Sequence, residues 1–198
     1  MRVRIRSKGG LSLWMAVGLV ATSGSICLAE VVRLDLDPDR TAISFSLPAT
    51  LHTVNGTMKL QRGFIAFEAA TGRAQGEVVV SSRSAATGHK GRDRTMHRKV
   101  LDSERFPLMV FYPEKVKGSL VDGETGELVV EGWIELQGER HPIAWLTRVE
   151  READHLSVGI DFEIPYVEWG LNDPSKLLLR VGPVVRVRVH AQGILSQR

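Results

Sequence analysis

The chain has 198 residues, of which 43% are hydrophobic and 25% are charged, a balance typical of a globular protein rather than a disordered one. Its single cysteine, Cys27, excludes a disulfide framework and a cysteine-rich metal site. The formal net charge is +3, but the position of the basic residues decides what that charge means.

The first segment of the chain has the three-part organisation of a cleaved secretory signal peptide. Four basic side chains lie between Arg2 and Lys8, and residues 11–20 are mostly apolar. Cys27 and Ala29 then provide small side chains three residues and one residue before a cut after Ala29. The apolar run is shorter than the ~20 residues that span a bilayer, so a retained membrane anchor is the weaker alternative. We predict that residues 1–29 are removed and that residues 30–198 form a periplasmic protein.

Removal of this segment changes the net charge of the chain. All four of its charged residues are basic, so residues 30–198 keep 22 basic and 23 acidic residues, a net charge of −1. Cys27 is lost as well, which excludes a thiolate nucleophile. With no basic excess and no glycine-rich phosphate loop, we expect no nucleic-acid partner.

Alternation of apolar and polar residues dominates the rest of the chain. In residues 156–164, five apolar residues alternate with four small or acidic ones and share one face of a strand. Asn55-Gly56, Thr71-Gly72 and Gln137-Gly138 are turn signals, and Gly132 marks a bulge or a close approach of two backbones. The other predicted strands are residues 42–47, 64–68, 77–82, 108–112, 128–136, 142–149 and 185–191.

About eight short strands indicate an all-β sandwich or barrel. A barrel of that size either fills its interior with side chains or holds one small ligand, and alternation alone does not choose between the two.

Residues 84–104 break the pattern, because they are polar, rich in Arg and His, and poor in β-branched side chains. Residues 92–101 could make two or three turns of helix, with Met96, Val100 and Leu101 on one face. So few apolar residues suit a helix that lies across one end of a barrel.

Five ordered segments of the chain carry recognisable motifs. Residues 91–111 combine an arginine–aspartate helix with an aromatic-proline step into a strand, and residues 51–58 contain an early His and a Val-x-Gly hairpin. The others are residues 63–67, 130–143 and 167–175. In this order the segments resemble the YceI-like family, and the resemblance extends over nearly all of the predicted mature chain.

This resemblance implies a lipocalin-like, closed antiparallel β-barrel with one short helix, exported to the periplasm. It also implies a lengthwise pore that binds a polyisoprenoid lipid, such as a quinone or a polyprenyl phosphate. Many members of the family carry an arginine where this chain has Tyr166, so a charged head group bound by that arginine is not expected here.

Two groups of candidate ligand-binding residues follow. The apolar pore candidates share inward strand faces or lie near them, and a packed core is the alternative for each: Ile65, Phe67, Met109, Phe111, Ile134, Leu136, Val158, Ile160, Phe162 and Trp169. The polar mouth candidates could hydrogen-bond a lipid head group, with a purely structural role as the alternative: His52, Arg92, Asp93 and His97.

A catalytic or metal role for the polar group is not expected. Asp93 and His97 share a helix face, but His89 and His97 are eight residues apart and lack a further ligand motif nearby. No Gly-x-Ser-x-Gly motif occurs in the chain.

Three hypotheses remain open. The leading one is a non-enzymatic periplasmic carrier that holds an isoprenoid lipid or quinone and needs no other cofactor. The second is an interaction or stress-related barrel with a filled pore, and the third is a lipid-modifying enzyme that uses Arg92, Asp93 and His97. Transient membrane contact and a homodimer are compatible with all three.

Overall fold

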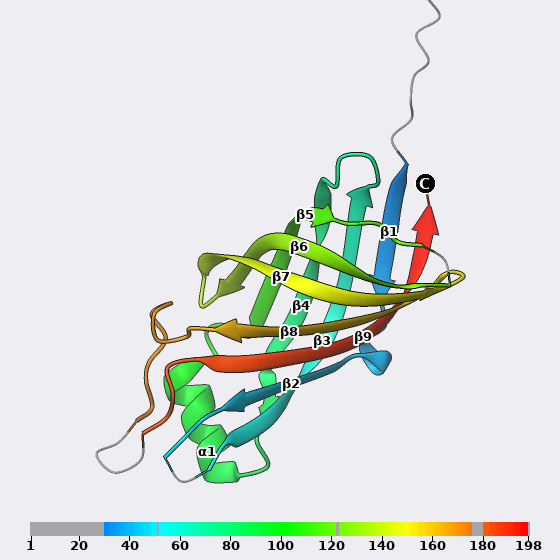
Figure 1. Ribbon diagram of the computed structural model, residues 1–198. Coiled ribbons are helices and arrows are strands. Elements are labelled where there is room, and N and C mark those ends of the chain that lie inside the picture. The colour runs from blue at the N-terminus through cyan, green and yellow to red at the C-terminus, as the bar shows by residue number, and fades with distance from the viewer. Residues whose placement is uncertain (1–29, 51, 122, 176–179, 198) are drawn as a thin grey trace, which may run out of the picture.

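The computed structural model describes residues 30–50, 52–121, 123–175 and 180–197, and the predicted signal peptide lies outside the described residues. Within these ranges, nine strands form one sheet (Figure 1), and the helical segments fall between strands in the order of the chain. The strands are β1 (Val31–Leu36), β2 (Ala42–Leu47), β3 (Val54–Glu68), β4 (Ala74–Ala86), β5 (Leu108–Lys117), β6 (Thr125–Leu136), β7 (Glu139–Glu152), β8 (His155–Ile164) and β9 (Val185–Gln197).

The sheet closes on itself as an antiparallel barrel. Its order is β1-β3-β2-β9-β8-β7-β6-β5-β4, and β3 also pairs with β4. Both β1 and β2 pair with β3 on one side and β9 on the other, so these two short strands occupy one position of the barrel, interrupted by the 3-10 turn η1 (Pro38–Arg40). The prediction of a closed, lipocalin-like barrel of about eight strands with one short helix is therefore confirmed, with β1 as an extra strand.

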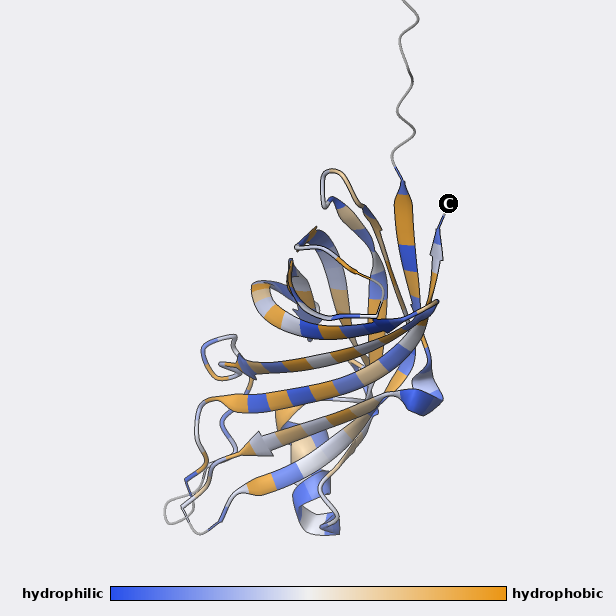
Figure 2. Ribbon diagram, turned by 45° about the vertical axis from the view of Figure 1, so that its right-hand side comes forward, coloured by the Kyte–Doolittle hydropathy of each residue, from blue (hydrophilic) through white to orange (hydrophobic). Residues whose placement is uncertain are grey.

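Hydrophobic and hydrophilic residues alternate along the strands, as the bands of hydropathy in Figure 2 show. On β6, for example, every second residue from Leu128 to Leu136 is buried, whereas the residues between them are partly exposed. Outward charges pair across strands: Arg186 with Glu163 at 2.9 Å and Arg188 with Asp161 at 2.6 Å. The apolar face of each strand thus lies inside the barrel and the charged face outside.

Two of the predicted turns are found and one is wrong. Gln137 and Gly138 both have positive φ and join β6 to β7 directly, as a two-residue hairpin turn requires. Gly72, with φ of 70°, lies in the turn between β3 and β4. Asn55-Gly56, in contrast, lies within β3 and pairs with Ser46 and Phe45 of β2.

Gly132 allows a close approach and is not itself a bulge. A methyl group there would overlap the carbonyl oxygen of Tyr112 and lie 2.9 Å from Phe111 Cε2. The irregularity lies on the opposite strand, where the register shifts between Pro113 and Lys115.

The predicted helix forms and lies across one end of the barrel (Figure 1). It consists of α1 (Lys90–Thr95), which continues as a π-helical segment, η2 (Met96–Val100). The His89 side chain caps its start by accepting a hydrogen bond from the Arg92 amide at 3.3 Å. Among the described residues, no helix has both the length and the apolar character needed to cross a membrane.

Candidate functional site

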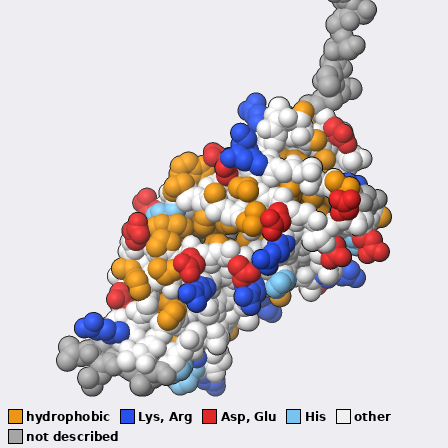
Figure 3. Space-filling view, in the orientation of Figure 1, with side chains coloured by type: hydrophobic (Ala, Val, Ile, Leu, Met, Phe, Trp, Pro, Cys, Tyr) orange, Lys and Arg blue, Asp and Glu red, His pale blue; other side chains and the backbone are white. Residues whose placement is uncertain are grey.

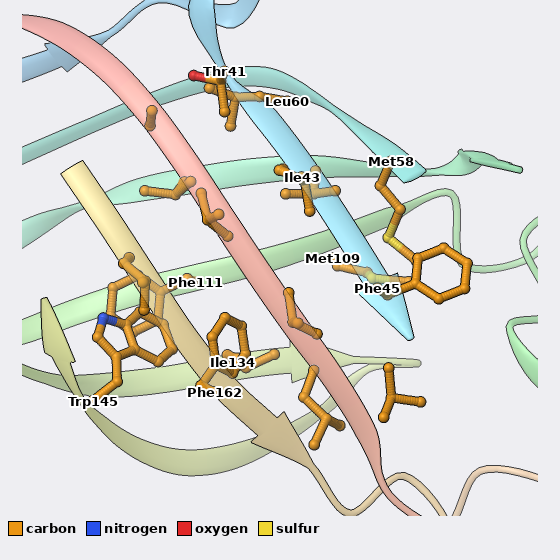
Figure 4. Close-up of a pocket in the computed structure, with 18 of the residues that line it drawn as sticks. Thr41, Ile43, Phe45, Met58, Leu60, Met109, Phe111, Ile134, Trp145 and Phe162 are labelled. Carbon is orange, nitrogen blue, oxygen red and sulfur yellow. The ribbon is translucent and has the colours of Figure 1, made fainter. Parts of the chain in front are cut away.

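An apolar cavity of about 710 Å³ lies inside the barrel, and inward side chains from all nine strands contribute to its wall. Figure 4 shows side chains from opposite sides of the barrel around this space, including Ile43 and Phe45 of β2 and Ile134 of β6. The volume is in the range of roughly 300–1,000 Å³ that is usual for small-molecule sites. The interior is therefore only partly filled by side chains.

Nine of the ten apolar candidates lie in the cavity wall: Ile65, Phe67, Met109, Phe111, Ile134, Leu136, Val158, Ile160 and Phe162. Trp169 does not line the cavity in the described structure. Its ring stacks on that of His141, with centroids 4.3 Å apart and planes 3° from parallel. Trp169 packs beside the cavity wall instead of forming part of it.

Sequence reasoning missed a large part of the wall. Ile43 and Phe45 on β2, Met58 and Leu60 on β3, and the inward residues of β9 all line the cavity. The alternation within residues 42–47 and 185–191 was the signal that could have identified the wall residues on β2 and β9. Met58 and Leu60 gave a weaker signal, because this strand was predicted only from residue 64, whereas β3 begins at Val54.

Three aromatic side chains form one group within the wall. The Trp145 ring lies between Phe111, at a centroid distance of 4.6 Å, and Phe162, at 4.7 Å, as Figure 4 shows. Such tilted contacts favour a rigid arrangement of the rings. This group, Phe111–Trp145–Phe162, joins β5, β7 and β8 across the interior.

The helix end of the cavity carries the polar candidates Arg92 and Asp93. Arg92 lines the cavity, and its guanidinium donates from Nε to Thr87 Oγ1 at 2.8 Å and from Nη2 to the Thr87 carbonyl oxygen at 3.1 Å. Asp93 accepts hydrogen bonds from the Thr87 amide, at 2.9 Å, and from the Thr87 hydroxyl. These bonds tie the helix to the residue that follows β4.

The hydrogen bonds also set the charge of Asp93. The Thr87 hydroxyl bond is the main cause of a lowered pKa for the Asp93 carboxyl, with smaller contributions from the Thr87 amide and from Arg92 and His97. The carboxylate is thus held ionised as an acceptor, which suits a tether more than a proton donor.

The two histidine candidates lie outside the cavity wall as described. His97 is half-buried, and its Nδ1 is 2.9 Å from Ser103 Oγ. His52 is exposed between β2 and β3. His89, which the sequence analysis weighed with His97 as a possible metal ligand, does line the cavity, and it also caps the helix. Within the described ranges, no cluster of three or more His, Cys, Asp or Glu side chains could hold a metal ion.

Tyr166, at the arginine position of the resemblance, is buried in the cavity wall and only 3% exposed. The segment that follows β8 and contains Tyr166 lies against the helix, since Asn172 donates from Nδ2 to the Lys99 carbonyl oxygen at 2.9 Å. The Tyr166 hydroxyl has no hydrogen-bond partner within the described protein. Burial, helped by the charge of Asp173, raises the pKa of Tyr166 to about 12.

Comparison with known proteins gives one family and several structures. The family model of the YceI-like domain matches residues 34–193. No curated protein sequence matches the chain significantly.

The solved structures similar to this chain share its fold at low sequence identity. A polyisoprenoid-binding domain from Saccharophagus degradans, implicated in plant cell wall breakdown, is 17% identical over 81% of this chain and 97% of its own, with a TM-score of 0.60. Burkholderia cenocepacia BcnA is 14% identical over 80% and 99%, with a TM-score of 0.66. A Campylobacter jejuni YceI protein is 14% identical over 67% and 79%, with a TM-score of 0.53.

Proposed function

Because the chain belongs to the YceI-like domain family, we propose that it is a periplasmic carrier that holds a long isoprenoid lipid, of the quinone or polyprenyl type, inside its barrel. The observation that carries this proposal is the apolar cavity enclosed by the strands. An isoprenoid tail is long, apolar and flexible, and it matches a wall that is built almost entirely from aliphatic and aromatic side chains.

Burial of the tail supplies the affinity. Each Å² of apolar surface removed from water contributes roughly 25 cal/mol, so a few isoprene units are sufficient for micromolar binding even after the costs of association. The tail needs no directional contacts, so we expect the protein to tolerate tails of different length. The naming of the Saccharophagus degradans domain as polyisoprenoid-binding supports the same ligand class.

The two other hypotheses are less well supported. An open volume of about 710 Å³ argues against a filled pore whose only role is protein contact. For an enzyme, Arg92, Asp93 and His97 should converge on the cavity. Instead Asp93 is bound to Thr87, and His97 is bound to Ser103.

Export and membrane contact belong to this proposal as well. The signal-like residues 1–29 direct the chain to the periplasm, where a carrier would collect its lipid from a membrane. Figure 3 shows exposed hydrophobic side chains among the charged ones on the face over β6 and β7, and Leu146 of β7 is 48% exposed there. This face is a candidate for transient contact with a membrane or with a second copy of the chain.

Native mass spectrometry of the protein purified from the periplasm tests the proposal. We expect a discrete added mass that solvent extraction identifies as an isoprenoid lipid, or uptake of such a lipid by the stripped protein. A protein that stays bare after incubation with isoprenoid quinones and polyprenyl lipids would contradict the carrier function.

A further inference from the structure

The cavity wall contains a buried hydroxyl that the protein leaves without a partner. Four threonines line the cavity. Thr41 donates to the Asp37 carbonyl oxygen at 2.7 Å, Thr95 to the Gly91 carbonyl oxygen at 3.2 Å, and Thr87 to Asp93. Among these described threonines, Thr147 is the one whose hydroxyl has no hydrogen bond.

The surroundings of Thr147 are apolar. It is 3% exposed, and its register partners, Leu128 on β6 and Ile160 on β8, also line the cavity. Along β7 the other positions of the same face are His141, Ile143, Trp145 and Val149, so a valine would continue the apolar wall at position 147. An unpaired hydroxyl at such a position is unfavourable in the empty protein.

A second unpaired donor lies next to it on the same strand. Trp145 precedes Thr147 by two residues, so both side chains point to the same face of β7, ~7 Å apart along the strand. The Trp145 indole nitrogen also has no partner in the described protein. An indole N–H can only donate, so the group that satisfies it must be an acceptor.

We propose that Thr147 and Trp145 bind an oxygen of the lipid head group inside the barrel, and that the preferred ligand is an uncharged lipid with a carbonyl oxygen, such as a prenylated quinone. This inference rests on the carrier function proposed above. The quinone ring would pack against the aromatic group Phe111–Trp145–Phe162, while the isoprenoid tail extends along the remaining apolar wall.

The scarcity of charged residues in the cavity wall favours an uncharged head group beside Thr147 and Trp145. In the described part of the wall, Arg92 is the residue with a permanent charge, and it lies in the helix at the barrel end. The donors at Thr147 and Trp145 are neutral, so a phosphate beside them would be a buried anion without a counter-charge, which is strongly unfavourable. A carbonyl oxygen needs only the two donors.

Competition binding with two matched probes tests the inference. The first is a short-chain prenylated benzoquinone, and the second is the prenylated benzene with the same tail and no carbonyl. We expect the stripped wild-type protein to prefer the quinone by about tenfold. Thr147→Val keeps the shape of the side chain, and it should remove most of this preference by weakening quinone binding alone.

Thr41→Val is the control, because it also removes a wall hydroxyl but one that already has a partner. It should keep the preference for the quinone. Trp145→Phe, tested as a separate variant, should also reduce the preference for the quinone. A melting temperature for Thr147→Val equal to or above that of the wild type would show that the variant folds.

The outcomes separate the two proposals. If wild type binds both probes equally, or if Thr147→Val keeps the full preference, the subsite is wrong and the carrier function stands. If neither probe binds to wild type, the carrier function fails with it. Binding of a polyprenyl phosphate more tightly than the quinone would overturn the choice of a neutral head group.

Discussion

Gly56 on β3 lies under the aromatic ring of Phe45 on the neighbouring strand β2. A methyl group at Gly56 would overlap this ring and lie 2.7 Å from the Ala86 carbonyl oxygen. Phe45 belongs to the cavity wall, and its ring occupies the space that a side chain at position 56 would take. A glycine beneath an aromatic ring in a sheet is a packing device, and it explains why Asn55-Gly56 is not a turn.

We expect Gly56→Ala to destabilise the protein by about 1–3 kcal/mol, because the added methyl group must displace the Phe45 ring or the β4 backbone. Urea denaturation measures this effect. Gly126→Ala is the matched control, since the nearest atom to a methyl group on this β6 glycine is 3.6 Å away. Equal unfolding free energies for the two variants would contradict this account of Gly56.

The burial of Tyr166 makes the free energy of unfolding depend on pH. Its pKa rises from about 10 in an unfolded chain to about 12 in the folded one. The contribution to stability is therefore complete below pH ~10 and is lost as the pH rises toward 12, because the unfolded state releases its proton first. We expect the unfolding free energy of wild type to fall more steeply than that of Tyr166→Phe over this range.

Urea denaturation at pH 9 and at pH 11 measures the difference. Tyr166→Phe also removes an unpaired buried hydroxyl, so below pH 10 this variant should be at least as stable as wild type. Parallel pH profiles for the two proteins would mean that Tyr166 is not buried as described.

At the scale of elements, hydrogen bonds attach the helix to the rest of the protein at both of its ends, to Thr87 at its start and to Gln137 and Asn172 at its end. The segment α1 and η2 is short, and a helix of this length is marginal without tertiary contacts. Its apolar contacts with the cavity come from Met96, Val100 and Leu101, the three residues that the sequence placed on one face. At the start of the helix, Thr87 donates hydrogen bonds to Asp93 and accepts them from Arg92.

Asp93→Ala should loosen the helix while leaving the barrel intact. Bonds to a charged acceptor contribute about 1.5–3 kcal/mol, so amide hydrogen exchange in residues 90–100 should accelerate by roughly tenfold or more. Exchange in β6 and β7 should not change. Asp39→Ala, at the exposed turn η1, is the control and should leave the helix amides as protected as in wild type. Faster exchange across the whole barrel would indicate global destabilisation instead of a lost tether.

The bounds of the strands could be predicted from the sequence only where no contact with another strand decides them. The strand at 156–164 was predicted with nearly its observed bounds, because its alternation is regular and no special contact interrupts it. β3 was predicted only from residue 64, because the Asn55-Gly56 signal depends on local propensity and the Phe45 ring that overrides it comes from another strand. β1 was missed for a similar reason, since it is stabilised by pairing with β3 and β9.

At the scale of the whole molecule, the fold could be predicted but the interior could not. Alternation around a closed sheet places apolar side chains inside, as for Ile134 and Phe162. Whether they meet at the centre depends on the diameter and tilt of the barrel, which are set jointly by all the strands. The same long-range geometry decides that Trp169 stacks on His141 and that His52 lies away from the cavity wall.

A substitution that fills the cavity separates binding from folding. Val189 on β9 lines the cavity and pairs with Ile43 on one side and Ile160 on the other, so its side chain faces the interior between two other wall residues. Val189→Trp places an indole in this space, where the open volume limits the overpacking that a filled core would suffer. We expect uptake of isoprenoid lipid to fall by at least tenfold with little change in the circular dichroism spectrum. Gln192→Trp adds the same ring on the exposed side of β9 and should bind lipid as wild type does. Because the two variants share the added side chain and differ in which side of the sheet it occupies, unchanged uptake by Val189→Trp would mean that the lipid does not occupy the barrel.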